Sequence, residues 1–325
     1  MKRVVYSCPY IPAEWMAAHG LSPSRIMPSA ASDAAQIEGL CPYAEAFINE
    51  VTNDDDGCAI IVTTLCDQMR RAYDVISAEC GTRVFLMNVP STWKTVAAQR
   101  LYIDELKRLG RFLIRLGGQE PSNEQLADVM LAYDKSRAGL MAMQGRLPSR
   151  DMAQVIADFN RQGRAALEVR REQRQKTKRG VPLAIVGGPL LVEHLEVFDI
   201  VERCGGRIVL DATETGVRGM CGRFDRRSLR DDALGELAAA YFGTIPDASN
   251  RPNSRLYQWL KEQLDVNGVQ GILFHRYIWC DMWHAELARM REWAAVPVLD
   301  VDMGDGEAVS AGARQRIEAF LEMLR

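Results

Sequence analysis

Short runs of apolar, mostly β-branched residues alternate along this chain with segments whose apolar positions recur at helical spacing. Most runs fit a strand buried on both faces of a parallel sheet. They predict strands at residues 2–7, 60–65, 82–89, 183–186, 207–210, 268–274 and 296–301, and an extended segment near Ile26. Strand, loop and helix recur in that order, which is typical of parallel sheets with right-handed crossovers. We therefore predict an α/β fold with two doubly wound parallel-sheet domains separated by a helical segment.

The predicted domain boundaries follow changes in this pattern. Residues 1–90 form a first α/β domain, residues 91–180 a helical segment and connector, and residues 181–325 a second α/β domain. The middle segment begins with an apolar stripe at helical spacing in 93–116, and its last helix is expected to run into the basic residues 170–179. Interspersed Glu residues indicate that this run is a solvated helix end rather than a surface for RNA or lipid.

Composition narrows the class of protein. The 325 residues suffice for two domains, 47% of them are hydrophobic, and the formal net charge is -3. That charge gives no reason to expect nucleic acid as a partner, and no apolar run is long enough to cross a bilayer. Pro9, Pro12 and Glu14 interrupt the N-terminal apolar residues too early for a signal peptide. We therefore expect a cytoplasmic protein that binds neither nucleic acid nor membrane.

The chain contains eight cysteines and no Cys-x-x-Cys pair. This spacing argues against a zinc ribbon, a thioredoxin-type site and a bacterial ferredoxin run. Without a secretory signal, a disulfide framework is not expected either. Two interpretations stay open: the thiols are inert core residues, or thiols from distant segments converge on a metal or cluster.

Three cysteines stand where helices are predicted to begin. Cys66 and Cys280 each follow an apolar strand, precede an Asp and open a helix, whose dipole favours the thiolate. They lie in opposite halves of the chain, so facing strand ends would direct both into one interdomain cleft. Cys41 begins a third helix, with Pro42 at the first helical position. Three convergent thiolates without close pairing suit an iron–sulfur cluster, whereas zinc sites more often show a close ligand pair.

Cys41-Pro42-Tyr43, Thr64 to Arg71 and Cys280-Asp281 resemble the three cysteine motifs of 2-hydroxyacyl-CoA dehydratase subunits, component D of 2-hydroxyglutaryl-CoA dehydratase among them. Benzoyl-CoA reductase subunits belong to the same superfamily. Weaker similarities run in family order through nearly the whole chain, at residues 10–14, 19–25, 187–189, 216–218 and 316–322.

The resemblance implies an iron–sulfur subunit with one 4Fe–4S cluster held by Cys41, Cys66 and Cys280 between two α/β domains. A separate ATP-hydrolysing iron–sulfur activator would supply one electron, which passes to an acyl-CoA thioester and makes a ketyl radical. Loss of the 2-hydroxyl as water would make the enzyme a lyase of anaerobic metabolism. The resemblance also implies a homologous second subunit, or a homodimer.

Two alternatives remain open from the sequence. One is an ATP-dependent low-potential reductase, either of the benzoyl-CoA reductase type or with a double-cubane 8Fe cluster that recruits Cys8 or Cys221. The other is a non-catalytic partner subunit whose thiols only pack in the core. Some relatives carry a cysteine near residues 216–218; here the nearest equivalents are Thr213 and Glu214, so the fourth cluster ligand stays undetermined.

His275 and His284 flank the third cysteine. Either could donate a proton, or donate a hydrogen bond to a cluster sulfur or a CoA carbonyl. The alternative for each is an ordinary polar residue at the edge of a cleft. Trp279 and Trp283 are expected to pack around the cluster and lower its exposure to solvent.

Two further kinds of site residue follow from the resemblance alone. Glu14 is a candidate catalytic residue near the acyl-CoA route. Arg25, Gly187 and Gly188 are candidate substrate-binding residues. For Arg25, the alternative is an ordinary surface charge.

Overall fold

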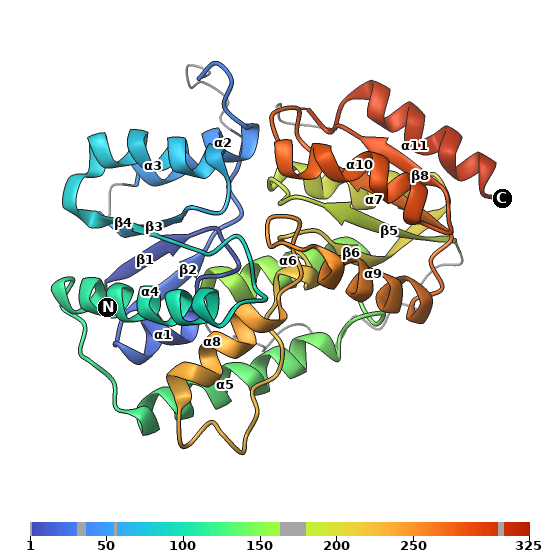
Figure 1. Cartoon of the computed structure of the whole chain (residues 1–325). Coiled ribbons are helices and arrows are strands. Elements are labelled where there is room, and N and C mark those ends of the chain that lie inside the picture. Colours follow the sequence, from blue (N-terminus) through green and yellow to red (C-terminus); the bar gives the residue numbers. More distant parts are fainter. Residues whose placement is uncertain (1, 31–36, 55–56, 163–179, 305–308) are drawn as a thin grey trace.

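The computed structural model describes residues 2–30, 37–54, 57–162, 180–304 and 309–325. It contains two four-stranded sheets in which all strands are parallel, which confirms the predicted fold class. The first sheet has the order β2-β1-β3-β4 and the second the order β6-β5-β7-β8 (Figure 1). The strands are β1 (Arg3–Tyr6), β2 (Ser22–Arg25), β3 (Ala59–Thr63), β4 (Val84–Met87), β5 (Val181–Gly187), β6 (Gly206–Ala212), β7 (Gly271–His275) and β8 (Val298–Val301).

Helices cover both faces of the first sheet (Figure 1). They are α1 (Ala13–Ala18), α2 (Pro42–Thr52), α3 (Asp67–Cys80) and α4 (Val96–Arg115). Successive strand residues point to opposite faces. Val5, Ile60 and Val62 therefore pack with α2 and α3, whereas Val4 and Ile61 pack with α1 and α4. Because both faces are buried, the strands read as continuous apolar runs in the sequence.

The second sheet is covered in the same way. Its helices are α6 (Ser149–Gln162), α7 (Glu196–Arg203), α9 (Ser254–Val266), α10 (Asp281–Trp293) and α11 (Ala311–Met323), with 3-10 turns at Glu193–Leu195 and Val217–Gly219. A further 3-10 turn, Gly81–Arg83, precedes β4 of the first sheet. Leu183 and Ile185 face α7 and α11, and Ala184 and Val186 face α9 and α10.

The middle segment packs against both halves. Helix α5 (Asn123–Met141) contacts α1 and α8 (Ala233–Thr244), and α6 contacts β2 and β6. Leu237 and Phe242 of α8 belong to the same core cluster as Leu106 and Leu109 of α4, so residues far along the chain complete the first core. The predicted basic run 170–179 lies outside the described residues. Within the part of the chain described here, no helix combines the length and apolar character that a membrane span requires.

Element ends differ from the sequence prediction where a side chain caps a helix. Helix α4 begins at Val96 rather than near Trp93, because Thr95 is its N-cap and its hydroxyl accepts a hydrogen bond from the Ala98 N–H at 3.1 Å. Strand β3 ends at Thr63 rather than residue 65, three residues before Cys66, the N-cap of α3.

The two sheets have corresponding connections. In each sheet, the second strand in sequence lies on one side of the first strand, and the third and fourth strands lie on the other side. The direction therefore reverses between β1 and β3, and again between β5 and β7. Ligands of open α/β sheets bind outside the carboxyl ends of strands at such switch points. The loops after β3 and β7 carry Cys66 and Cys280.

Candidate functional site

Each of the three predicted ligand cysteines is the N-cap of a helix. Cys41 precedes α2, Cys66 precedes α3 and Cys280 precedes α10. The N–H of Met69 donates to the Cys66 sulfur at 3.4 Å. Helix N-termini present unpaired N–H groups and a positive dipole end, which favour the thiolate and oppose the effect of burial on the thiol pKa.

The three thiols interact electrostatically with one another. Burial raises the pKa of the Cys41 thiol to about 11 and that of Cys66 to about 12, and it also raises the pKa of Cys280. A charge on Cys41 raises the pKa of Cys66 further, and charges on both raise that of Cys280. Cys280 packs against the apolar cluster that contains Cys41, and Cys66 lines one cavity with Met282, two residues after Cys280. The fold thus brings the three helix starts to the same region of the molecule.

Apolar side chains from both domains surround this site. Leu191 and Tyr277, from the second half of the chain, lie in the same buried cluster as Cys41 and Phe47 from the first half. Cys280 is half-buried and packs against this cluster. Low-polarity surroundings strengthen every electrostatic interaction inside them, so the three thiolates would strongly attract a cationic group.

The donor set fits a cluster better than a single ion. Among the described residues, no three His, Cys, Asp or Glu side chains converge closely enough to hold one metal ion. In an iron–sulfur cluster, each thiolate binds its own iron atom, so the sulfurs stand farther apart than the ligands of one ion. Cys41, Cys66 and Cys280 would be the sulfur ligands of such a cluster, with an N–H donor at Cys66 and apolar side chains around Cys41 and Cys280.

An open cavity of about 680 Å³ lies beside Cys66. The first half of the chain lines it with residues from the ends of β3 and β4 and the start of α4, and the second half with Ser249, Arg251 and Met282. A bond of 2.6 Å from the Arg251 N–H to the Ser91 carbonyl joins the two sides. The sequence analysis missed Arg251 because no motif marks it; only the fold brings it to this cavity.

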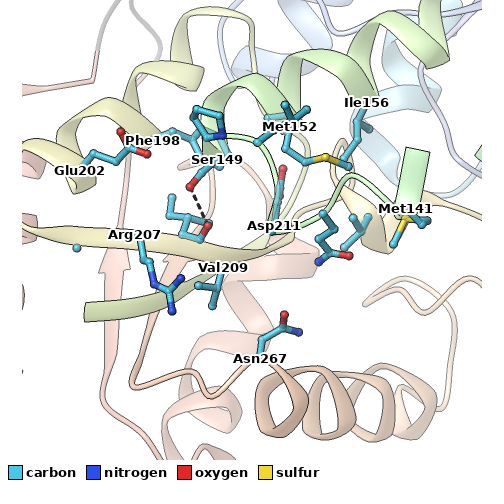
Figure 2. A pocket seen from close by; sticks show the side chains of 18 of the residues that line it. Met141, Ser149, Met152, Ile156, Phe198, Glu202, Arg207, Val209, Asp211 and Asn267 are labelled. Carbon is cyan, nitrogen blue, oxygen red and sulfur yellow. Dashed lines mark hydrogen bonds between the residues drawn. The ribbon is translucent and has the colours of Figure 1, made fainter. Parts of the chain in front are cut away.

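A second cavity, of about 580 Å³, lies along the edge strand β6 (Figure 2). Arg207 and Asp211 of β6 line it, together with Ser149 of α6, whose hydroxyl donates to the Ile208 carbonyl at 2.9 Å. None of the described residues that line it is a cysteine. The cavity beside Cys66 is therefore the better candidate for chemistry at the thiols.

Residues 8–324 match the family described as 2-hydroxyglutaryl-CoA dehydratase, D-component. The chain belongs to this family. A comparison with curated proteins finds no match. Among solved structures, a Cd-bound periplasmic metal binding protein from Candidatus Liberibacter asiaticus is 12% identical, with complete coverage of both chains and a TM-score of 0.27. The laminin-binding adhesin of Streptococcus agalactiae is 11% identical, again with complete coverage of both, at a TM-score of 0.24. Scores this low support no structural conclusion.

Arg25 of this D-component family member lies inside the interface between the domains. It is 6% exposed. Its Nε donates to the Ser7 carbonyl at 2.8 Å, and its two terminal nitrogens donate to the carbonyls of Gly219, at 3.0 Å, and Glu214, at 2.8 Å. The guanidinium thereby joins the ends of β1 and β2 to the loop after β6.

Gly187 and Gly188 end strand β5 at the second switch point. A Cβ on Gly187 would lie 1.9 Å from the His275 carbonyl oxygen, and one on Gly188 would lie 3.3 Å from Trp283. The Gly188 carbonyl accepts from the N–H of Glu214 at 3.4 Å. These glycines allow the loops after β5, β6 and β7 to approach one another closely.

Glu14 lies in a separate buried cluster. It is fully buried, accepts from Arg137 at 3.0 Å and accepts from the Tyr241 hydroxyl at 2.5 Å. Cys221 lies in the same cluster; burial raises the pKa of its thiol to about 12, and Arg137 lowers it. Glu14 and Cys221 thus join α1, α5 and α8.

Cys8 is the other cysteine considered as an additional cluster ligand, and it belongs to the core cluster of the first sheet. It is buried at the end of β1 and interacts electrostatically with Glu214. Burial raises the pKa of the Cys8 thiol to about 12, and a hydrogen bond with the Thr63 side chain lowers it. Thr63 is the last residue of β3, so Cys8 stands beside the first switch point.

The two histidines that flank the third cysteine have different surroundings. His275 is fully buried, its Nε2 lies 3.2 Å from the Pro189 carbonyl, and burial lowers its pKa to about 4. His284 is exposed on α10. Trp283 is 3% exposed, whereas Trp279 is 49% exposed. Of the two tryptophans expected near the cluster, Trp283 is buried and Trp279 is open to solvent.

Proposed function

We propose that this chain is the iron–sulfur subunit of a 2-hydroxyacyl-CoA dehydratase, with Cys41, Cys66 and Cys280 as ligands of a 4Fe–4S cluster. The observation that supports it most is the shared site of three helix-capping thiols, contributed by both domains of a chain that belongs to a dehydratase component family. Neither family membership alone nor the three cysteines alone would support this proposal. A family member without convergent thiols would suggest a non-catalytic partner.

When bound, the cluster would lend one electron, received from a separate ATP-hydrolysing activator, to the thioester of a 2-hydroxyacyl-CoA; the 2-hydroxyl would leave with a proton from C3 as water, and the electron would return to the cluster, so that the dehydration is redox-neutral overall. The residues of this chain would bind and orient the substrate. Arg70 and Arg251 line the cavity beside Cys66 from opposite domains, and their side chains are 57% and 46% exposed. Exposed guanidinium groups bind phosphate bidentately, so these two arginines are suited to hold the phosphates of CoA.

The proposal is tested by counting iron and acid-labile sulfide after anaerobic purification. We expect about four irons and four sulfides per chain, as a single cubane requires. About eight irons would favour the double-cubane reductase, and an iron-free chain would favour the non-catalytic partner. Cys66→Ala and Cys280→Ala should each abolish iron binding.

Cys204→Ala is the matched control, because Cys204 is the C-cap residue of α7 and has no place among the three thiols. Its iron content should equal that of the wild type. If Cys66→Ala keeps its full iron content, the ligand assignment is wrong. A chain with four irons should dehydrate a 2-hydroxyacyl-CoA only when the activator and ATP are both present.

A further inference from the structure

The second cavity lies at the open edge of a sheet. It extends along β6, the outer strand of the second sheet, and consecutive residues 206–209 of this strand line it (Figure 2). Successive residues of a strand point to opposite faces, so a cavity lined by four in a row lies beside the backbone itself. Strand β5 pairs with one side of β6, and among the described residues no strand pairs with the other. The cavity therefore borders an edge that can accept one more strand.

The backbone of this edge suits a peptide. The hydroxyl of Ser149 on α6 donates to the Ile208 carbonyl at 2.9 Å, as the N–H of a neighbouring strand would. The volume of about 580 Å³ falls within the roughly 300–1,000 Å³ of pockets that bind small ligands. An extended peptide binds a strand edge through main-chain hydrogen bonds. Its donors and acceptors repeat at the spacing of those on β6.

Two side chains of opposite charge line the cavity from the two ends of β6. Arg207 is the second residue of the strand and Asp211 the sixth, about 10–13 Å apart along it. The Arg207 Nε is buried and has no hydrogen-bond partner among the described residues. One Asp211 oxygen accepts from the N–H and the hydroxyl of Thr213, at 3.0 and 2.6 Å, and burial raises the pKa of this carboxyl. An anion at Arg207 and a cation at Asp211 would compensate two desolvated groups.

Apolar side chains lie on both sides of this edge. Figure 2 shows Met152 and Phe198 on one side of β6 and Asn267 on the other. Val266, at the end of α9, is 82% exposed, and Met141, at the end of α5, is 38% exposed. The side chains of an added strand alternate between two faces, so apolar ones would find contacts on each.

We propose that this cavity binds a short apolar peptide with free termini, extended along the edge of β6. Its carboxylate pairs with Arg207 and its ammonium group with Asp211, so the peptide runs antiparallel to β6. An extended chain rises about 3.4 Å per residue, so three or four residues span the two charges. The site contains no cysteine among its described residues, and the inference goes beyond the proposed function.

Isothermal titration calorimetry with trileucine tests the proposal. The probe is used in three forms: with free termini, as the C-terminal amide and as the N-acetyl derivative. We expect the free form to bind the wild type about tenfold more tightly than either blocked form, because each loses one charged hydrogen bond. Arg207→Gln should weaken binding of the free form about tenfold and leave that of the amide unchanged. Asp211→Asn should weaken the free form equally and leave the N-acetyl derivative unchanged.

Arg203→Gln is the matched control. Arg203 is exposed on α7, 3.9 Å from Glu196, and does not line the cavity, so its affinities should equal those of the wild type. Equal binding of all three forms to the wild type, or no binding at millimolar trileucine, would overturn the proposal. If Arg207→Gln weakens the amide as much as the free form, the carboxylate does not lie at Arg207 and the proposed orientation is wrong. Iron-free chain should give the same affinities, so this result and the proposed function fail separately.

Discussion

The guanidinium of Arg25 donates a 2.8 Å hydrogen bond to the backbone carbonyl of Glu214. The two residues stand at the ends of equivalent strands, β2 and β6, in different sheets. Arg25 therefore fixes one domain against the other at the place where the three thiols meet. The sequence suggested Arg25 as a substrate-binding residue. In the structure, its guanidinium donates hydrogen bonds to three backbone carbonyls at the interface.

Replacing Arg25 should loosen this interface. Arg25→Met keeps much of the side-chain volume but leaves the carbonyls of Ser7, Glu214 and Gly219 without these donors. Hydrogen bonds to a charged donor contribute about 1.5–3 kcal/mol each, so we expect a loss of several kcal/mol in the free energy of unfolding by urea. Arg230→Met, at an exposed pair with Asp128, should cost no more than about 1 kcal/mol. Equal effects of the two substitutions would contradict this role of Arg25.

Glu14 should affect stability before it affects catalysis. Glu14→Ala leaves Arg137 as a buried charge without its 3.0 Å partner, and removing one member of a buried ion pair typically costs about 3–5 kcal/mol. Thermal or urea unfolding measures this loss. The folded fraction should retain its iron, because Glu14 lies in a different cluster from the three thiols. A Glu14→Ala protein of normal stability that had lost only activity would favour a catalytic Glu14 instead.

Gly187 should tolerate no side chain. A methyl group there would lie 1.9 Å from the His275 carbonyl oxygen, a distance that forces β5 and the end of β7 apart. We expect Gly187→Ala to destabilise the fold by about 1–3 kcal/mol, the usual cost of overpacking. Gly243→Ala, in helix α8 with no atom within 4 Å of the new methyl group, should be neutral or stabilising by up to about 1 kcal/mol. Paired urea melts compare the two, and equal destabilisation would rule out the steric explanation.

Stability should fall as the solution becomes acidic, in part through two buried histidines. Burial lowers the pKa of His194 to about 3 and that of His275 to about 4. Below the unfolded pKa of about 6.5, the unfolded chain binds protons that the folded chain does not, so this stability is present above that pH and is lost as pH falls. Each histidine should account for about 2 kcal/mol between pH 7 and pH 5.

The pKa of Glu214 is raised to about 7, so its protonation stabilises the folded chain as the pH falls from 7 to 5, opposite to the histidines. Variants of single histidines are therefore needed to isolate the histidine contribution. Unfolding free energies at pH 5 and pH 7 should differ less in His194→Gln than in the wild type. His284→Gln, at an exposed position, should leave the difference unchanged. A wild-type pH dependence in His194→Gln would show that His194 is protonated equally in both states.

The sequence by itself determined the fold class and the three thiols. Buried parallel strands need continuous apolar runs, and a cysteine between a strand and a helix is visible as a local pattern at Cys66 and Cys280. These are properties of neighbouring residues, so periodicity and spacing report them. The sequence also indicated that the fourth ligand position lacks the cysteine of some relatives, but the type of donor was left undetermined.

Only the tertiary structure decided what the charged residues do. Arg25 and Glu14 look like cleft residues in the sequence, yet one bonds backbone carbonyls across the domain interface and the other pairs with Arg137 in the core. The bond between Arg25 and the Glu214 backbone, which joins residues 189 positions apart, and the place of Arg251 at the cavity beside Cys66 both depend on segments distant in the chain. Contacts between such segments follow from how two sheets pack together, and no local pattern of residues records that packing.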